Sequence, residues 1–257
     1  MSEPKPKMVA FLCNWCSYAG ADLAGVSRVQ YPPNIRVIRV MCSGRVDPVV
    51  VVEALMRGVE GVLVAGCHPG DCHYIGGNYQ AAKRFEVLAR MLESTEFRGR
   101  VRLEWVSASE GARFGEVVSS FVSQVAGLGP SPVRTSPEAR SRLQAVRDTM
   151  DNPRVRNLLG KFLHLTEKEN VYGNRYPVPE MEKVLWDVIR AVYDRASIFN
   201  LAGERPVTVV EAARATGIPA DRVLRHIAVM KKRNLMAMTE SHGRHPSYTA
   251  VRSGRSM

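Results

Sequence analysis

The first half of the chain alternates short apolar runs with helical patterns. The apolar runs are residues 8–12, 35–41, 62–65 and 101–106. Three of them are rich in β-branched side chains, so we expect four strands. The clearest helical stripe lies between residues 114 and 125, where apolar side chains recur every three or four positions. Single helices between strands predict parallel crossovers, and therefore an α/β fold with a doubly wound parallel sheet of the flavodoxin-like or Rossmann-like kind.

The second half is helical and ends in a different pattern. Residues 127–137 are rich in Gly, Pro and Ser, which is typical of a linker. Near the end, two short helical stretches around a tight turn precede two strand-like runs, and this order predicts a winged helix-turn-helix. The expected organisation is an α/β domain at 1–126, a linker at 127–137, a helical segment at 138–202 and a winged-helix domain at 203–257.

Charge is distributed unevenly between the halves. Residues 1–133 carry 14 Lys and Arg against 12 Asp and Glu, whereas residues 134–257 carry 22 against 13. A basic second half suits nucleic acid or an acidic protein partner, although a solvated Arg-rich surface explains it equally well. No apolar run approaches the roughly 18–20 residues that span a bilayer, and the start does not resemble a signal peptide. We therefore expect a cytoplasmic protein that does not interact with membranes.

The five cysteines all lie within the first 72 residues. Cys13, Cys42 and Cys67 each follow a predicted strand, and the carboxyl ends of parallel strands meet at one edge of a sheet, where ligands bind. Cys16 and Cys72 come three and five positions after Cys13 and Cys67. All five thiols can therefore converge on one small volume.

Clustered cysteines in a chain without an export signal more often bind metal or do redox chemistry than form disulfides. Four thiolates can hold zinc or an iron–sulfur cluster. A domain that already has a full sheet needs no structural zinc, which favours the cluster. His68 and His73 flank two of the cysteines as possible ligands, hydrogen-bond donors or plain loop residues. The alternative for the cysteines is a set of buried structural thiols.

Three motifs resemble a known family: FLCNWCSYAGAD, RVMCSGRVDP and GVLVAGCHPGDCHYIGGN. They are similar to the delta subunit of methyl-viologen-reducing hydrogenase, also known as the hydrogenase iron–sulfur subunit, over residues of about 7–124. The resemblance implies one 2Fe–2S cluster held by four of the five cysteines Cys13, Cys16, Cys42, Cys67 and Cys72. It also implies electron transfer between dehydrogenase or hydrogenase subunits and the flavin subunit of an electron-bifurcating heterodisulfide reductase.

Other residues of the matched motifs have two interpretations. Arg45, Asp47, Asp71 and Asn78 either support the cluster or a partner interface, or serve as turn and cap residues. We find no nucleophile–base pair, phosphate loop or flavin fingerprint. The chain is therefore expected to transfer electrons within an oxidoreductase complex without being catalytic alone.

The winged segment has two possible uses, docking onto protein partners or binding DNA. We favour docking, because the positive charge is modest. The main alternative function is a redox-sensing iron–sulfur transcription regulator that binds DNA through this segment; a zinc-bearing scaffold is a third. The candidate DNA contacts are Arg222, Arg225, Lys231, Lys232, Arg233, Arg244 and His245.

Overall fold

A computed structural model describes residues 5–242 and 245–251. Contacts divide the chain into one unit of residues 1–143 and a second of residues 144–257, and the division falls within a helix. The finer division into four parts stays a prediction. In the described part of the chain, no helix is both long enough and apolar enough to cross a membrane.

The first unit is built on a four-stranded sheet in which all described strands are parallel. The strands lie in the order β2-β1-β3-β4, which confirms the predicted parallel α/β architecture. Every residue of β3 is buried, as expected of a central strand covered on both faces. The strands are β1 (Met8–Cys13), β2 (Ile35–Val40), β3 (Gly61–Gly66) and β4 (Val101–Trp105).

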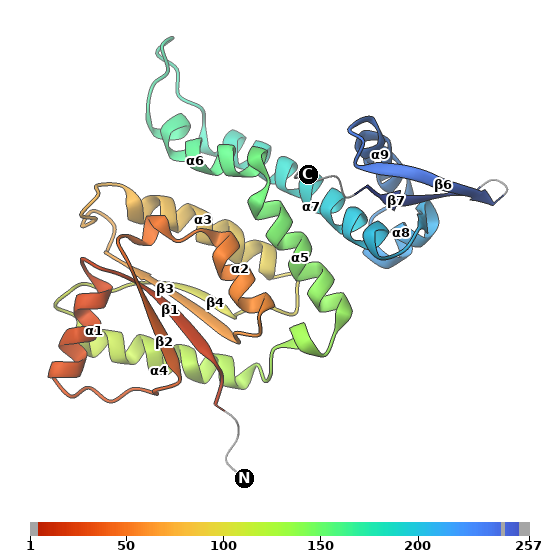
Figure 1. The fold of residues 1–257 in the computed structure, drawn as a ribbon. Helices are drawn as coiled ribbons and strands as arrows, with labels where there is room; N and C mark the ends of the chain where they lie inside the picture. Colours follow the sequence, from red (N-terminus) through yellow and green to blue (C-terminus); the bar gives the residue numbers. More distant parts are fainter. Residues whose placement is uncertain (1–4, 243–244, 252–257) are drawn as a thin grey trace. The chain divides into compact units, whose positions relative to one another are not determined.

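Helices cover both faces of this sheet. Helices α1 and α4 pack together on one face, with the apolar stripe of α4 against β1 and β3, and α2 and α3 lie on the other (Figure 1). Asp47 caps α2 by accepting a hydrogen bond from the Val49 N–H, and Pro48 is the first helical residue. The elements are α1 (Ser17–Val26), η1 (Ser43–Arg45), α2 (Pro48–Met56), α3 (Gly77–Leu92) and α4 (Gly111–Gly127).

The segment predicted as a linker is held against the first unit. It contains a short 3₁₀ helix, η2 (Pro132–Arg134). Arg100 is buried at 2% exposure and donates hydrogen bonds to the carbonyl oxygens of Leu128, Gly129 and Pro130. Burial lowers the pKa of this guanidinium, partly opposed by Glu60. Satisfying these carbonyls gives the segment a fixed course.

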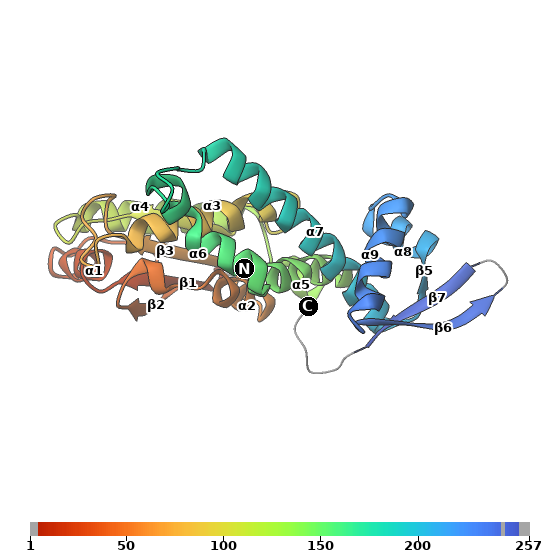
Figure 2. The same cartoon turned by 90° about the horizontal axis from the view of Figure 1, so that it is seen from above.

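Helices dominate the second unit, which ends in a small antiparallel sheet of order β5-β7-β6. The two predicted short helices and the hairpin are present, and β6 and β7 lie side by side next to α8 and α9 (Figure 2). The short strand β5, which no sequence pattern indicated, pairs with β7. The elements are α5 (Pro137–Asp151), α6 (Pro153–Glu167), α7 (Val178–Glu204), β5 (Val207–Thr208), α8 (Val209–Thr216), α9 (Ala220–Lys232), β6 (Met236–His242) and β7 (His245–Ala250).

Local signals explain the bounds of α8. Thr208 and Glu211 form a reciprocal capping box at its start. Gly217 ends the helix with a φ of +71°, a conformation that glycine adopts without strain. The apolar face of α9, formed by Val223, Ile227 and Met230, is buried in the core of the second unit.

Candidate metal centre

The turns that follow β1, β2 and β3 bring the cysteines to the carboxyl edge of the sheet. Cys13 is the last residue of β1, and Cys16 directly precedes α1. Cys42 precedes η1, Cys67 directly follows β3, and Cys72 lies in the loop before α3. All five are buried and none forms a disulfide.

The sulfur atoms form two close groups. Cys13, Cys16 and Cys67 have their Sγ atoms within 4.8 Å of one another, and the Sγ atoms of Cys13 and Cys67 are 3.8 Å apart. In the second group, the Sγ atoms of Cys42 and Cys72 are 3.7 Å apart. These separations are far longer than the roughly 2 Å of an S–S bond and suit thiols that share a bound metal.

Hydrogen bonds inside the first group spread the pKa values of its thiols. A hydrogen bond from the Cys16 thiol lowers the pKa of Cys13 to about 5. The same contact, together with burial, raises the pKa of Cys16. Burial raises the pKa of Cys67. One member is therefore readily available as a thiolate, the form that binds metal.

The second group is electrostatically linked to the first. Burial raises the pKa of Cys42 to about 11, and the negative charges of Cys72 and Cys13 add to this rise. Burial also acts to raise the pKa of Cys72, but hydrogen bonds from the Tyr74 and Asn78 N–H groups and from the Cys42 thiol together outweigh it, so that this pKa is lowered. A cation among the thiols would offset the mutual repulsion of their charged forms.

Two polar side chains hold the strand ends that carry the cysteines. The Ser17 hydroxyl accepts a hydrogen bond from the Cys13 N–H (2.8 Å) and donates one to the Ala65 carbonyl (2.7 Å). Asn78 is buried and donates to the carbonyl oxygens of Cys67 and His68. Asn78 therefore supports the site, whereas Asp47 serves as a helix cap.

Space around the second group is tight. A Cβ atom placed on Gly77 would clash with Cys42 Sγ and would lie 3.2 Å from Cys72 Sγ. Only glycine lets the start of α3 approach these thiols so closely. The glycine-rich composition of this loop indicated close backbone approach in general, but not which of its glycines was responsible.

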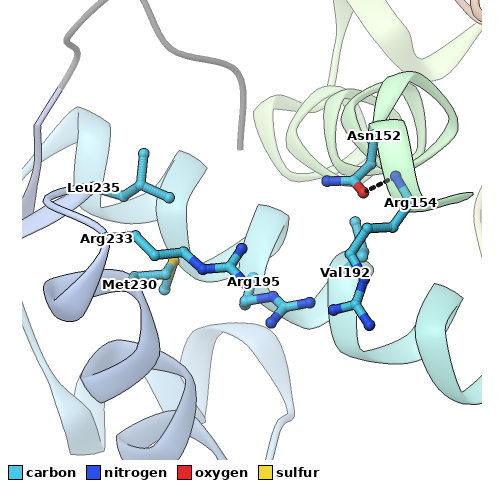
Figure 3. A pocket seen from close by; sticks show the side chains of 7 residues that line it. All are labelled: Asn152, Arg154, Val192, Arg195, Met230, Arg233 and Leu235. Carbon is cyan, nitrogen blue, oxygen red and sulfur yellow. Dashed lines mark hydrogen bonds between the residues drawn. The ribbon is translucent and has the colours of Figure 1, made fainter.

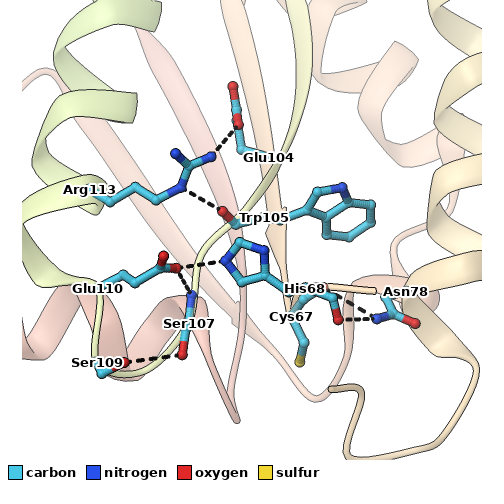
Figure 4. A network of polar contacts seen from close by, with 9 residues as sticks. All are labelled: Cys67, His68, Asn78, Glu104, Trp105, Ser107, Ser109, Glu110 and Arg113. Carbon is cyan, nitrogen blue, oxygen red and sulfur yellow. Dashed lines mark hydrogen bonds and ion pairs between the residues drawn. The ribbon is translucent and has the colours of Figure 1, made fainter. Parts of the chain in front are cut away.

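Neither histidine of the loop lies among the grouped sulfur atoms. The His68 ring points toward Glu110, and His68 Nε2 lies 2.7 Å from Glu110 Oε2. The Cys67 thiol points away from the His68 ring (Figure 4). Glu110 also accepts a hydrogen bond from the Ser107 N–H, which is the main cause of its lowered pKa. His73 stacks on Trp15 with ring centroids 3.8 Å apart. Both imidazoles thus serve other contacts, and the grouped donors are sulfur alone.

An unpartnered hydroxyl belongs to the residue that follows Cys42. The Ser43 Oγ atom, next to Cys42, is buried and has no hydrogen-bond partner among the described residues. Buried polar atoms of proteins are normally satisfied. Ser43 would be satisfied by donating to a sulfur of a bound cluster, so the donor set and this hydroxyl fit an iron–sulfur group.

Comparison with known proteins gives this half of the chain a family. Residues 8–129 match the family model described as methyl-viologen-reducing hydrogenase, delta subunit. The iron-sulfur subunit of the F420-non-reducing hydrogenase of Archaeoglobus profundus is 52% identical over 132 residues, which cover 51% of this chain and 96% of that protein. The chain belongs to this delta-subunit family.

Other relatives of the matched region occur in two settings. The iron-sulfur subunit of the F420-non-reducing hydrogenase vhc of Methanococcus voltae is 48% identical over 131 residues, 51% of this chain and 91% of that protein. One subunit of the ferredoxin/F(420)H(2)-dependent CoB-CoM heterodisulfide reductase of Methanosarcina acetivorans is 53% identical over 126 residues, 49% of this chain but only 16% of that longer protein. The same domain is thus a separate chain in some proteins and a small part of a larger chain in others.

Three of the seven candidate DNA contacts of the second unit are engaged within the protein. Arg222 Nε lies 3.0 Å from the buried carboxylate of Asp194, and Arg225 pairs with Asp221 on its own helix. The Lys231 ammonium lies 5.7 Å from the centre of the Tyr248 ring, a cation–π contact. Arg233 lines a small pocket of the second unit. Arg244 lies outside the described residues, as does the side chain of His245.

Proposed function

We propose that the chain is the iron–sulfur electron-transfer subunit of a larger oxidoreductase complex. The observation that carries the proposal is the convergence of five buried, free thiols from three successive βα turns at one edge of the sheet. Soft sulfur donors without oxygen ligands favour iron–sulfur clusters and zinc over hard metals. The relatives named as iron-sulfur subunits favour the cluster.

The spacing of the thiols suggests which of them would hold a 2Fe–2S cluster. A tetrahedral metal with two thiolates at about 2.3 Å separates their sulfur atoms by about 3.8 Å. Cys13 with Cys67 and Cys42 with Cys72 have this separation, at 3.8 and 3.7 Å. We assign one pair to each iron, with Cys16 as the fifth thiol, whose Sγ lies within 4.8 Å of those of Cys13 and Cys67.

Such a cluster would pass single electrons between partner subunits. The protein supplies orientation, a buried environment and hydrogen bonds to the sulfur atoms, and these tune the reduction potential. Relatives named as subunits of hydrogenases and of heterodisulfide reductases support an upstream dehydrogenase or hydrogenase and a downstream heterodisulfide reductase flavin subunit. Electron bifurcation at that flavin, and a cytoplasmic location, are part of the proposal.

The loops around the cysteines offer a surface for the flavin subunit. Trp15, Met41, Tyr74 and Ile75 are exposed apolar residues in the turns that carry the thiols, and Ile75 is 88% exposed. Apolar groups gathered at a surface are typical of protein interfaces. In the Methanosarcina relative the same domain is part of a heterodisulfide reductase chain itself, so we assign this surface to a partner of that kind.

We assign the last part of the second unit, residues 203–257, a winged-helix fold used for docking onto partner subunits. A helix, a tight turn, a second helix and a hairpin follow one another in it, which is the order of a winged helix. The contacts of Arg222 and Arg225 with Asp194 and Asp221 reduce the charge that α9 could offer to phosphates. The redox-sensing regulator is therefore the weaker alternative. Duplex-DNA binding with a steep salt dependence would favour it.

Isolation of the native complex tests the function. We expect this chain to copurify, under anaerobic conditions, with a flavin-containing subunit of a heterodisulfide reductase and with dehydrogenase or hydrogenase subunits, identified by mass spectrometry. The reduced complex should show the electron paramagnetic resonance signal of a 2Fe–2S centre, and that signal should be lost in Cys67→Ala. An isolated chain without redox partners, or a complex whose signals are unchanged by Cys67→Ala, would contradict the proposal.

A further inference from the structure

Three arginines of the second unit converge on one small pocket. Arg154 comes from the start of α6, Arg195 from the middle of α7, and Arg233 from the end of α9 (Figure 3). The remaining walls are mainly apolar and include Val192, Met230 and Leu235. No residue that lines the pocket in the described part of the chain carries a carboxylate.

The positive charge in this pocket is only partly compensated by the described residues. None of the three guanidinium groups has a hydrogen bond or ion pair to another described residue. Burial lowers the pKa of Arg195, and the neighbouring charges of Arg233 and Arg154 lower it further, partly opposed by the charge of Asp194. The carboxylate of Asp194, the residue before Arg195, is occupied by Arg222 and His226, at 3.0 and 3.3 Å. Like charges held together in this way favour a bound anion.

The start of α6 adds to the positive potential. Asn152 lines the pocket and caps the helix by accepting a hydrogen bond from the Arg154 N–H at 3.0 Å. The positive end of the α6 dipole therefore lies at the pocket. A helix start alone does not make a site, but here it is combined with three guanidinium groups from three different helices.

The geometry points to a binding site for a compact oxyanion of the phosphate class. Guanidinium groups bind phosphate oxygens through paired N–H donors, and three of them can surround a tetrahedral anion. The pocket is small, so the phosphate group itself, free or at the end of a small ester, is the ligand. The site lies outside residues 8–129, the part of the chain that matches the delta-subunit family. It is independent of the cysteine centre.

Calorimetric titration of the full chain tests this site. Inorganic phosphate, a small phosphomonoester such as glycerol phosphate, and a short DNA duplex would be titrated in chloride buffers of matched ionic strength. We expect saturable binding of inorganic phosphate or of the ester, and the tighter of the two identifies the source of the anion. Arg195→Gln should weaken this binding about tenfold to a hundredfold, because it removes a charge-assisted hydrogen bond.

Matched variants separate a binding role from a structural one. Arg190→Gln removes an exposed arginine of the same helix that does not line the pocket, and it should leave binding unchanged. Without phosphate, Arg195→Gln should unfold at an equal or higher temperature than the wild type, because the repulsion between the arginines is relieved. Added phosphate should raise the unfolding temperature of the wild type more than that of the variant. If Arg195→Gln does not fold, Arg154→Gln and Arg233→Gln at the same pocket provide the test.

Three results would overturn the inference. The first is that phosphate binds no more tightly than chloride. The second is that the wild type and the pocket variants bind phosphate with equal affinity. The third is that the chain binds the DNA duplex but neither of the small phosphates. None of them affects the iron content of the chain, so failure here is distinguishable from failure of the proposed function.

Discussion

Replacing Gly77 with alanine probes the space around two of the cysteines. The added Cβ would lie less than 3.0 Å from Cys42 Sγ and 3.2 Å from Cys72 Sγ, whereas ordinary contacts begin at 3.4 Å. The Cys42 thiol therefore has to move by more than about 0.4 Å. Metal sites tolerate ligand displacements of only about 0.2 Å, so the shift is at least about twice what a bound cluster accepts.

We expect Gly77→Ala to lose iron at least about tenfold faster than the wild type when challenged with a chelator under anaerobic conditions. The stability of the metal-free chain should change much less, because overpacking costs about 1–3 kcal/mol while alanine in a helix gains about 1 kcal/mol over glycine. Absorbance of the cluster and thermal unfolding measure the two effects separately.

The adjacent glycine provides the control. A Cβ on Gly76 would meet nothing within 4 Å, and its φ of −125° suits any residue. Gly76→Ala should therefore keep the iron of the wild type. If Gly77→Ala also keeps it, Cys42 and Cys72 do not hold the cluster, and the reasoning from spacing is refuted.

Three further predictions concern the fifth thiol, a buried arginine and a carboxylate. Cys16→Ala should keep bound iron with a shifted reduction potential, whereas alanine at Cys13 should abolish iron binding; equal loss in both would refute the assignment. Arg100→Ala should lower the free energy of unfolding in denaturant titrations by about 2–4 kcal/mol, because carbonyls of the 128–130 segment lose their donor, and the exposed Arg98→Ala should not. The pKa of Glu110 is lowered from 4.5 on folding, so its stabilisation is present above pH 4.5 and is lost as the pH falls through the folded value. The melting temperatures of wild type and Glu110→Gln should accordingly converge below pH 4.5; a constant difference would contradict this.

The sheet and the edge at which the cysteines meet could be predicted because both follow from patterns along the chain. Apolar runs alternating with helical stripes define parallel strands, and a residue just after such a strand must lie at the carboxyl edge. Thus the positions of Cys13, Cys42 and Cys67 followed from their sequence context alone. The three strands predicted before these cysteines are present as β1, β2 and β3.

The division of the thiols into two groups could not be predicted in this way. It depends on side-chain packing differences of less than about 1 Å, such as the close approach of Gly77 to Cys42. Ser17 was missed as well, because a serine near the start of a helix usually signals only a cap. Its hydroxyl instead joins β1 to the Ala65 carbonyl of β3.

In the second unit, periodicity located the helices but not the partners of their charges. The pattern around residues 221–235 predicted an amphipathic helix with a basic face. It could not show that Arg222 contacts Asp194, which is 28 positions earlier in the chain. A count of basic residues therefore does not show how much positive charge α9 offers to a nucleic acid.

The central claim is that the cysteine centre holds an iron–sulfur cluster. The most direct measurement is the content of iron, acid-labile sulfide and zinc in the wild-type chain purified without oxygen. The account predicts a coloured protein with about two iron and two sulfide per chain, as in a 2Fe–2S cluster. A colourless protein with one zinc per chain and no sulfide would contradict it.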